Sequence, residues 1–118
     1  MSPARMRALL ARNPGFLKTF FDSIESRKMR GVLRAEERLA SRWALKSAFA
    51  WMLFLEGFLL PCDAYRELRV YNRSGGEPGV QIRSKAFKEL IGRCIGRTQV
   101  SLTHTRRWGM AFLSWESK

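Results

Sequence analysis

Five basic residues spaced four apart constrain this chain more than any other feature of its sequence. They are Arg30, Arg34, Arg38, Arg42 and Lys46, and Arg27 and Lys28 precede them. Residues four apart lie on successive turns of an α-helix, each rotated by about 40° from the last, so the set occupies one side of a helix. The opposite side carries Val32, Leu33, Leu39, Ala40, Trp43 and Ala44. The spacing therefore predicts an amphipathic helix with a basic face toward solvent and an apolar face toward a core.

The basic face indicates an anionic partner. Like charges four residues apart repel one another on a helix, and a face that meets only water usually mixes both signs. Glu37, near the edge of the face, is the one acid that offsets it. A polyphosphate backbone explains such a face best. A merely solvated face, an acidic protein and an anionic membrane surface remain alternatives, because Arg and Lys are also good helix formers.

The composition favours one folded domain that binds nucleic acid. A chain of 118 residues, 46% of them hydrophobic, has enough material for one core and too little for two, so we expect a single domain over 1–118. Eight Phe and four Trp residues exclude a disordered polyelectrolyte. Lys and Arg outnumber Asp and Glu by 22 to 10, which gives a net charge of +12. Most of these cations are arginines, which suit bidentate contact with phosphate.

The first part of the chain, residues 1–60, is expected to contain the N-terminal helices. Ser2 and Pro3 are typical of a helix start and predict a short helix over 3–12. Apolar residues recur at helical spacing over 16–24, so this segment is expected to pack into the core. The acidic residues of this part are interpreted as ordinary helix-surface charges: Asp22, Glu25, Glu36 and Glu37.

A long helical pattern ends this part. It runs from Val32 to Leu60 without a proline and becomes apolar on every side after Ala48. A membrane span needs about 20 apolar residues, and Lys46 and Glu56 leave far fewer between them. We therefore expect a buried helix and no stable membrane insertion.

The second part of the chain, residues 61–118, changes to an alternating pattern. Residues 68–72 and 80–83 alternate apolar with polar side chains, and glycines and a proline lie between them, which predicts a hairpin. Ser84 can cap the helix that follows, and Gly96 can end it. The expected fold class is mainly α with a small β-hairpin (α+β), a compact helical domain with a C-terminal nucleic-acid-binding unit.

Residues 88–108 resemble a helix-turn-helix unit. Gly92 is the small residue that lets two helices approach, and Gly96 supplies the turn between them. Thr98 would cap the second, recognition helix, and Leu102 would anchor it inward. The resemblance implies that the polar side chains of this second helix contact base edges and phosphates in the major groove.

A winged-helix-like unit is the alternative interpretation of the same segment. Residues 98–105 are rich in β-branched side chains and alternate, so a strand is as reasonable as a helix. That strand would pair with 108–115 after a helix over 85–95, with Arg106 and Arg107 at the tip of the wing. The sequence leaves helix and strand open.

The candidate nucleic-acid-binding residues come from both regions. The basic face contributes Arg27, Lys28, Arg30, Arg34, Arg38, Arg42 and Lys46. The C-terminal unit contributes Arg93, Arg97, Thr98, Gln99, Ser101, Thr103, His104, Arg106 and Arg107. No catalytic, cofactor-binding or metal-binding residue is expected, since Cys62, Cys94 and His104 are too few for a zinc site.

The function expected from these patterns is that of a non-enzymatic, cytoplasmic DNA-binding regulator of transcription or replication. Phosphate contacts from the basic face would position it, and residues 97–107 would contact a groove. An RNA-binding subunit of a ribonucleoprotein is the alternative, and a basic module or inhibitor that docks on an acidic partner is a further one. A metal-independent ribonuclease is not excluded, because His104, Tyr65, Tyr71 and Arg73 are available. Whether the protein is a homodimer or a subunit of a larger complex is open.

Overall fold

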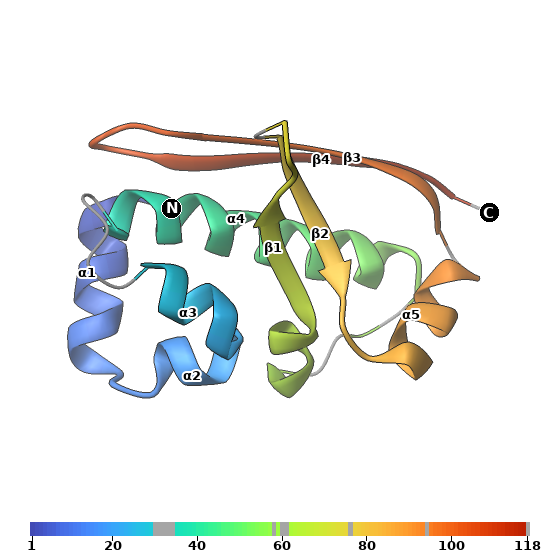
Figure 1. Ribbon diagram of the computed structural model, residues 1–118, viewed down its shortest axis with the longest axis horizontal. Helices are drawn as coiled ribbons and strands as arrows, with labels where there is room; N and C mark the ends of the chain where they lie inside the picture. Colours follow the sequence, from blue (N-terminus) through green and yellow to red (C-terminus); the bar gives the residue numbers. More distant parts are fainter. Residues whose placement is uncertain (30–34, 58, 60–61, 76, 94, 118) are drawn as a thin grey trace.

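One long helix, α4 (Ala35–Leu55), is the element on which most of the protein packs (Figure 1). The computed structural model describes residues 1–29, 35–57, 59, 62–75, 77–93 and 95–117. The elements before α4 are α1 (Pro3–Arg12), α2 (Phe16–Phe20) and α3 (Ser23–Met29). Those after it are η1 (Cys62–Glu67), β1 (Leu68–Asn72), β2 (Pro78–Ile82), α5 (Lys85–Gly92), β3 (Ile95–His104) and β4 (Gly109–Ser117).

The helix starts follow local capping rules. Ser2 Oγ accepts a hydrogen bond from the Arg5 N–H at 3.1 Å, and Pro3 occupies the first turn of α1. Ser84 caps α5 in the same way, because its Oγ accepts from the Phe87 N–H at 3.3 Å. The predicted helix over 3–12 is therefore present with its predicted cap.

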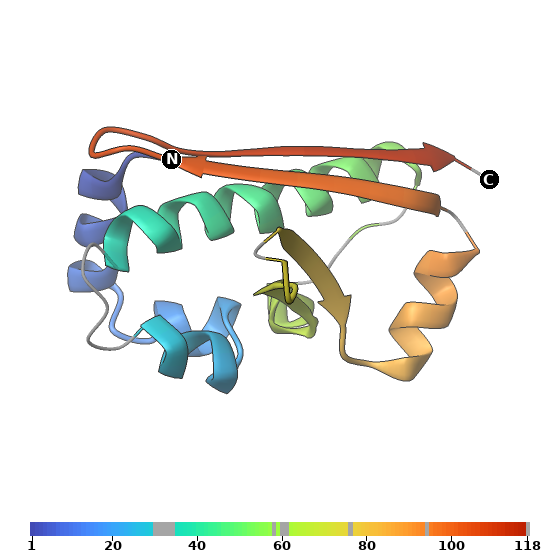
Figure 2. The ribbon, with the colours of Figure 1, turned by 45° about the horizontal axis from the view of Figure 1, so that its top comes forward.

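A two-stranded antiparallel ribbon, β3–β4, runs along α4 (Figures 1 and 2). Val100 pairs with Leu113, and Thr103 pairs with Met110. Successive side chains of a strand point to opposite faces, so alternate residues of β4 face the helix. Gly109 lies so close to α4 that a Cβ on it would be 2.4 Å from the Ser41 nitrogen. Met110 and Phe112 point the other way and are 57% and 65% exposed.

A second antiparallel pair, β1–β2, crosses beneath the ribbon (Figure 2). Val70 pairs with Val80, and Leu68 with Ile82, so the predicted hairpin is present. The short 3-10 helix η1 precedes β1 and packs on α2, whereas α5 follows β2 and packs on β2 and β3. These contacts bring η1 beside the N-terminal helices.

The core consists of two apolar clusters along α4. One cluster, of α1, α2 and the first half of α4, contains Met6, Phe16, Phe21, Leu39 and Ala40. The other, of the second half of α4 with β1, α5 and β3, contains Phe49, Leu53, Leu68, Ile91 and Ile95. Lys46 lies on α4 between the two.

The predicted C-terminal helix-turn-helix is wrong. The alternative strand over 98–105, paired with 108–115 after a helix, is present as β3 and β4 after α5. The winged-helix-like unit that these strands were expected to form is wrong. Residues 95–104 form β3, not a recognition helix, and Gly96 belongs to that strand instead of a turn. The physical reason is the run of β-branched residues, which pack better on a pleated surface than in a helix. The ribbon that replaces the helix is packed along α4 rather than projecting as a wing (Figure 2).

Among the described residues, no helix is long and apolar enough to cross a membrane.

Candidate anion-binding site

A buried network of charged groups joins α3 to its neighbours. Asp22 Oδ1 accepts a hydrogen bond from the Glu25 N–H at 2.7 Å, and Glu25 Oε1 accepts from the Asp22 N–H at 3.2 Å. This reciprocal pair is a capping box, with Asp as the capping residue. Glu25 Oε2 also accepts from the Val70 N–H at 3.1 Å, which ties β1 to α3.

Lys46 completes this network from α4. Its Nζ donates hydrogen bonds to Glu25 Oε1 at 2.7 Å, the Phe20 carbonyl at 2.7 Å and the Tyr65 carbonyl at 3.1 Å. It also lies 4.5 Å from the centre of the Phe21 ring. An ammonium has three donors, so the group is fully satisfied although the residue is 1% exposed. Burial raises the pKa of Glu25 and lowers the pKa of Lys46, and the opposite charge of each partner opposes the shift.

Asp22 is paired with cations from the β1–β2 hairpin. Its Oδ2 accepts a hydrogen bond from Arg69 Nε and lies 3.9 Å from Arg83 Nε. Burial pushes the pKa of Asp22 upward, but the bond from Glu25 N–H and the charges of Arg69 and Arg83 outweigh it, so the pKa is lowered. Asp22 and Glu25 are 0% and 3% exposed, and therefore the prediction that they are helix-surface charges is wrong.

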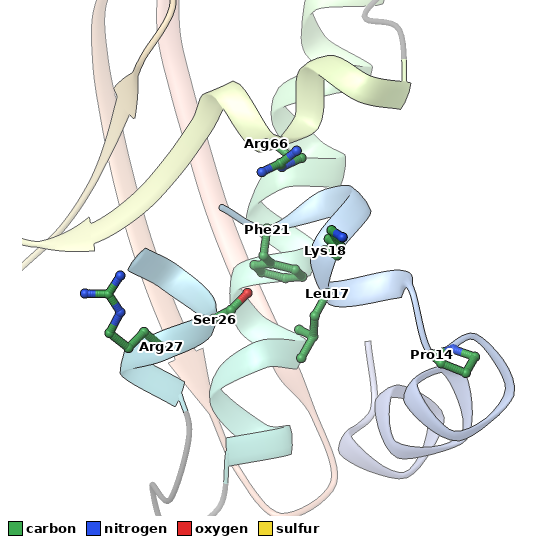
Figure 3. Close-up of a pocket in the computed structure, with 7 residues that line it drawn as sticks. All are labelled: Pro14, Leu17, Lys18, Phe21, Ser26, Arg27 and Arg66. Atoms are coloured by element: carbon green, nitrogen blue, oxygen red, sulfur yellow. The ribbon is translucent and has the colours of Figure 1, made fainter. Parts of the chain in front are cut away.

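A hollow of about 510 Å³ adjoins this network at Phe21, and Figure 3 shows the residues that line it. We call it the basic hollow. Lys18 of α2, Arg27 of α3 and Arg66 of η1 supply its cations, and Leu17 and Phe21 are among its apolar lining. In Figure 3 the Arg27 guanidinium points away from the other two cations. Within the described part of the chain none of the three is in an ion pair. An anion that entered would thus meet unneutralised positive charge.

An apolar groove of about 290 Å³ lies between α4 residues and Tyr65 of η1. It is lined by Ser47, Ala50, Trp51, Phe54, Leu59 and Tyr65. The rings of Trp51 and Phe54 are stacked with centroids 5.7 Å apart, yet the residues are 62% and 52% exposed. Tyr65 lines this groove and the next residue, Arg66, lines the basic hollow, so η1 contributes a side chain to each.

Arg42 is a buried cation of α4. It is 9% exposed, and among the described residues it makes no hydrogen bond or ion pair. Burial lowers the pKa of Arg42, which the Glu25 charge opposes and the Arg38 charge reinforces. No described side-chain nitrogen is both fully enclosed and unbonded, so the end of this guanidinium reaches solvent. A guanidinium held in this way is a candidate ligand for a phosphate.

The structure divides the predicted basic face. Arg27 and Arg38 are exposed, whereas Arg42 and Lys46 are buried, which corrects the prediction of one solvent-facing row. Five residues four apart turn through about 160° in total, so the last of them reach the packed side of the helix. The Lys28 side chain and all of Arg30 and Arg34 lie outside the described residues.

The C-terminal candidates are spread along the ribbon instead of forming one site. The exposed ones are Arg93, Arg97, Thr98, Gln99, Ser101, Thr103, Arg106 and Arg107, and the His104 side chain is outside the described residues. A ten-residue strand such as β3 spans about 33 Å, which separates Arg97 from Arg106. The structure does not bring these residues to the basic hollow, and as individual anion contacts they stay predictions.

Sequence reasoning missed most of the residues that the structure brings together. The spacing Asp22-x-x-Glu25 before a helix was a readable capping signal. No sequence signal indicated that Lys18 and Arg66 lie close together, because their proximity depends on the packing of η1 against α2. Among the described residues, no three His, Cys, Asp or Glu side chains are grouped to hold a metal ion.

Comparisons with known proteins add a fold likeness. No family model matches the chain, and no curated protein matches it significantly. The crystal structure of holo-[acyl-carrier-protein] synthase (AcpS) from Neisseria meningitidis matches with a TM-score of 0.81 and 21% identity, over 98% of this chain and 92% of that one. The ACPS–CoA complex of Chronobacterium ammoniagenes matches with a TM-score of 0.76 and 23% identity, over 100% and 92%. Holo-ACP-synthase from Plasmodium yoelii matches with a TM-score of 0.62 and 18% identity, over 100% and 91%.

These likenesses overturn the function predicted from the sequence. The neighbours are synthases that act with an acyl carrier protein, and one is a complex with CoA. The predictions of a non-enzymatic protein, of a DNA-binding regulator and of a nucleic acid as partner are therefore wrong, as are the ribonucleoprotein and docking-module alternatives. The error arose because a basic helix face identifies an anion but not which anion. Over nearly its whole length, the protein has the fold of the holo-acyl-carrier-protein synthases.

Proposed function

We propose that this protein is a transferase that moves the phosphopantetheinyl group of CoA onto a carrier protein. The observation that carries the proposal is the whole-length likeness to a holo-acyl-carrier-protein synthase, with a TM-score of 0.81 over 98% of the chain. The second neighbour, a complex with CoA, supports CoA as the substrate. A cytoplasmic location stays a prediction.

The free cations support an anionic substrate of this kind. CoA carries a pyrophosphate and a 3′-phosphate, and the net charge of this chain is +12. Lys18, Arg27 and Arg66 of the basic hollow have no acidic partner among the described residues, and the buried Arg42 has none either. In this proposal the phosphates are held by the cations of the basic hollow and by Arg42, whose buried guanidinium has no ion-pair partner among the described residues.

The apolar groove suits the uncharged part of the same molecule. The pantetheine arm is a chain of methylene and amide groups, and Trp51, Phe54 and Leu59 offer apolar surface beside the Ser47 hydroxyl. Adjacent residues of η1, Tyr65 and Arg66, line the groove and the basic hollow, which supports one ligand with a neutral arm and a charged end.

The reaction is a phosphoryl-type substitution whose charge these cations can stabilise. A carrier hydroxyl oxygen attacks the phosphorus that bears the pantetheine arm, and a new P–O bond forms. The bond from that phosphorus to the bridging oxygen breaks, and 3′,5′-ADP leaves while the hydroxyl proton passes to solvent. Negative charge develops on the leaving phosphate, so nearby Arg and Lys side chains lower the barrier.

The test is a transfer assay with matched variants. Purified protein, CoA and an apo carrier protein are incubated, and intact mass spectrometry follows the carrier. We expect gain of one phosphopantetheinyl group, and a rise in KM for CoA of about tenfold or more in Arg42→Gln. Arg5→Gln, a control at an exposed arginine of α1, should behave as wild type. No mass gain on any of several carriers, together with no CoA binding by calorimetry, would contradict the proposal.

A further inference from the structure

Lys46 contacts all three elements that supply the cations of the basic hollow. It donates to the carbonyl of Phe20 at the end of α2, to Glu25 of α3 and to the carbonyl of Tyr65 in η1. Each bonded residue lies close in sequence to a cation of the hollow. Phe20 is two residues after Lys18, and Glu25 is two residues before Arg27. Tyr65 directly precedes Arg66. One ammonium therefore holds the three cation-bearing segments at a common point.

The same group lies under the floor of the hollow. Nζ is 4.5 Å from the centre of the Phe21 ring, and Phe21 lines the hollow (Figure 3). Its three donors are all taken by protein acceptors, and the side chain is 0% exposed. Lys46 has no donor left for a substrate, so it can act on a ligand only through the groups that it positions.

We propose that Lys46 is a positioning residue that fixes the relative positions of the three segments that carry Lys18, Arg27 and Arg66, and thereby sets the affinity of the basic hollow for the phosphates of CoA. The proposal rests on the proposed function for the identity of the ligand, but the positioning itself rests on the three hydrogen bonds. A planar guanidinium cannot point three donors at converging acceptors as an ammonium does, so arginine is a poor substitute here.

The experiment compares Lys46→Met, Lys46→Arg and the double variant Glu25→Gln/Lys46→Met. Lys46→Met leaves Glu25 as an unpaired buried carboxylate, whereas the double variant removes both charges and should recover much of the lost stability. It does not restore a donor to the Phe20 and Tyr65 carbonyls. We expect KM for CoA to rise by about tenfold or more in both Met-containing variants, with a smaller change in kcat. Lys46→Arg should be intermediate, and Lys88→Met, on an exposed face of α5, should match wild type.

Amide hydrogen exchange gives a readout that needs no ligand. In both Met-containing variants, at a temperature where circular dichroism shows them folded, exchange should accelerate in the segments 19–26 and 62–70, which Lys46 joins. A double variant with recovered stability, wild-type KM and wild-type exchange would show that Lys46 only stabilises the fold, and would overturn the inference. If wild type neither binds nor uses CoA, the proposed function fails. In that case hydrogen exchange still tests the role of Lys46. Faster exchange of the two segments in both Met-containing variants would support the positioning role, and exchange at the wild-type rate would overturn it.

Discussion

Replacing Gly109 by alanine should force the ribbon away from α4. A Cβ at this position would lie 2.4 Å from the Ser41 nitrogen, 2.7 Å from the Ala40 carbonyl carbon and 2.8 Å from the Ala40 Cβ. An ordinary contact begins near 3.4 Å, so strand and helix must separate by about 1 Å. The first two atoms belong to the backbone and cannot rotate aside. We therefore expect a loss at the upper end of overpacking costs, about 3 kcal/mol.

Urea unfolding followed by tryptophan fluorescence measures this cost. A loss of about 3 kcal/mol corresponds to a fall in Tm of roughly 10 °C for a chain of this length. Gly92→Ala is the matched control, because a Cβ added to Gly92 would meet nothing within 4 Å and alanine favours a helix. It should stabilise slightly or have no effect. Equal stability of Gly109→Ala and wild type would refute the close packing of β4 on α4.

Substitutions at four further sites, Leu53, Ser84, Asp22 and Glu25, test other parts of the structure. Leu53→Ala, at a fully buried position of α4, should cost about 2–5 kcal/mol in urea unfolding, whereas Leu55→Ala, at a residue 68% exposed, should change stability by less than about 0.5 kcal/mol. Ser84→Ala removes the cap of α5 and should cost about 1 kcal/mol, while Ser84→Gly should cost only a few tenths. The pKa of Asp22 is lowered from its usual 3.8, so its contribution to stability is present above pH 3.8 and is lost as pH falls through the folded value. In Asp22→Asn, the free energy of unfolding should therefore fall less at acidic pH than it does in wild type. Glu25 has the opposite sign, because its pKa is raised from 4.5, so its contribution is present below pH 4.5 and lost as pH rises through the folded value. The double variant Glu25→Gln/Lys46→Met, which leaves neither buried charge unpaired, should lack this decline.

Local signals in the sequence predicted local structure well. Ser2 before Pro3 predicted α1, and the alternation of 68–72 with 80–83 predicted the β1–β2 hairpin. Leu39 and Ala40 lie in the core as their side of the basic helix indicated. Each of these features depends on residues close together in the chain, for which propensity and periodicity carry the information.

The candidate site could not be predicted because it depends on tertiary packing. Arg42 and Lys46 looked like solvent-facing members of a basic face, and both are buried because α4 is covered on more than one side. Nothing in the sequence indicates that Lys46 bonds to Phe20, 26 residues before it, and to Tyr65, 19 residues after it. The strand over 95–104 was an even choice from the pattern, and its pairing with β4 along the helix decided it.

The most direct test of the proposed function is the stoichiometry of transfer. Purified protein is mixed with CoA and an apo carrier protein, and both products are counted, the modified carrier by intact mass and 3′,5′-ADP by chromatography. A phosphopantetheinyl transferase releases one 3′,5′-ADP for each carrier molecule that gains the group, and neither product forms when CoA is replaced by pantetheine, which lacks the pyrophosphate. Absence of both products with CoA, from folded protein and across several carriers, would contradict the assignment.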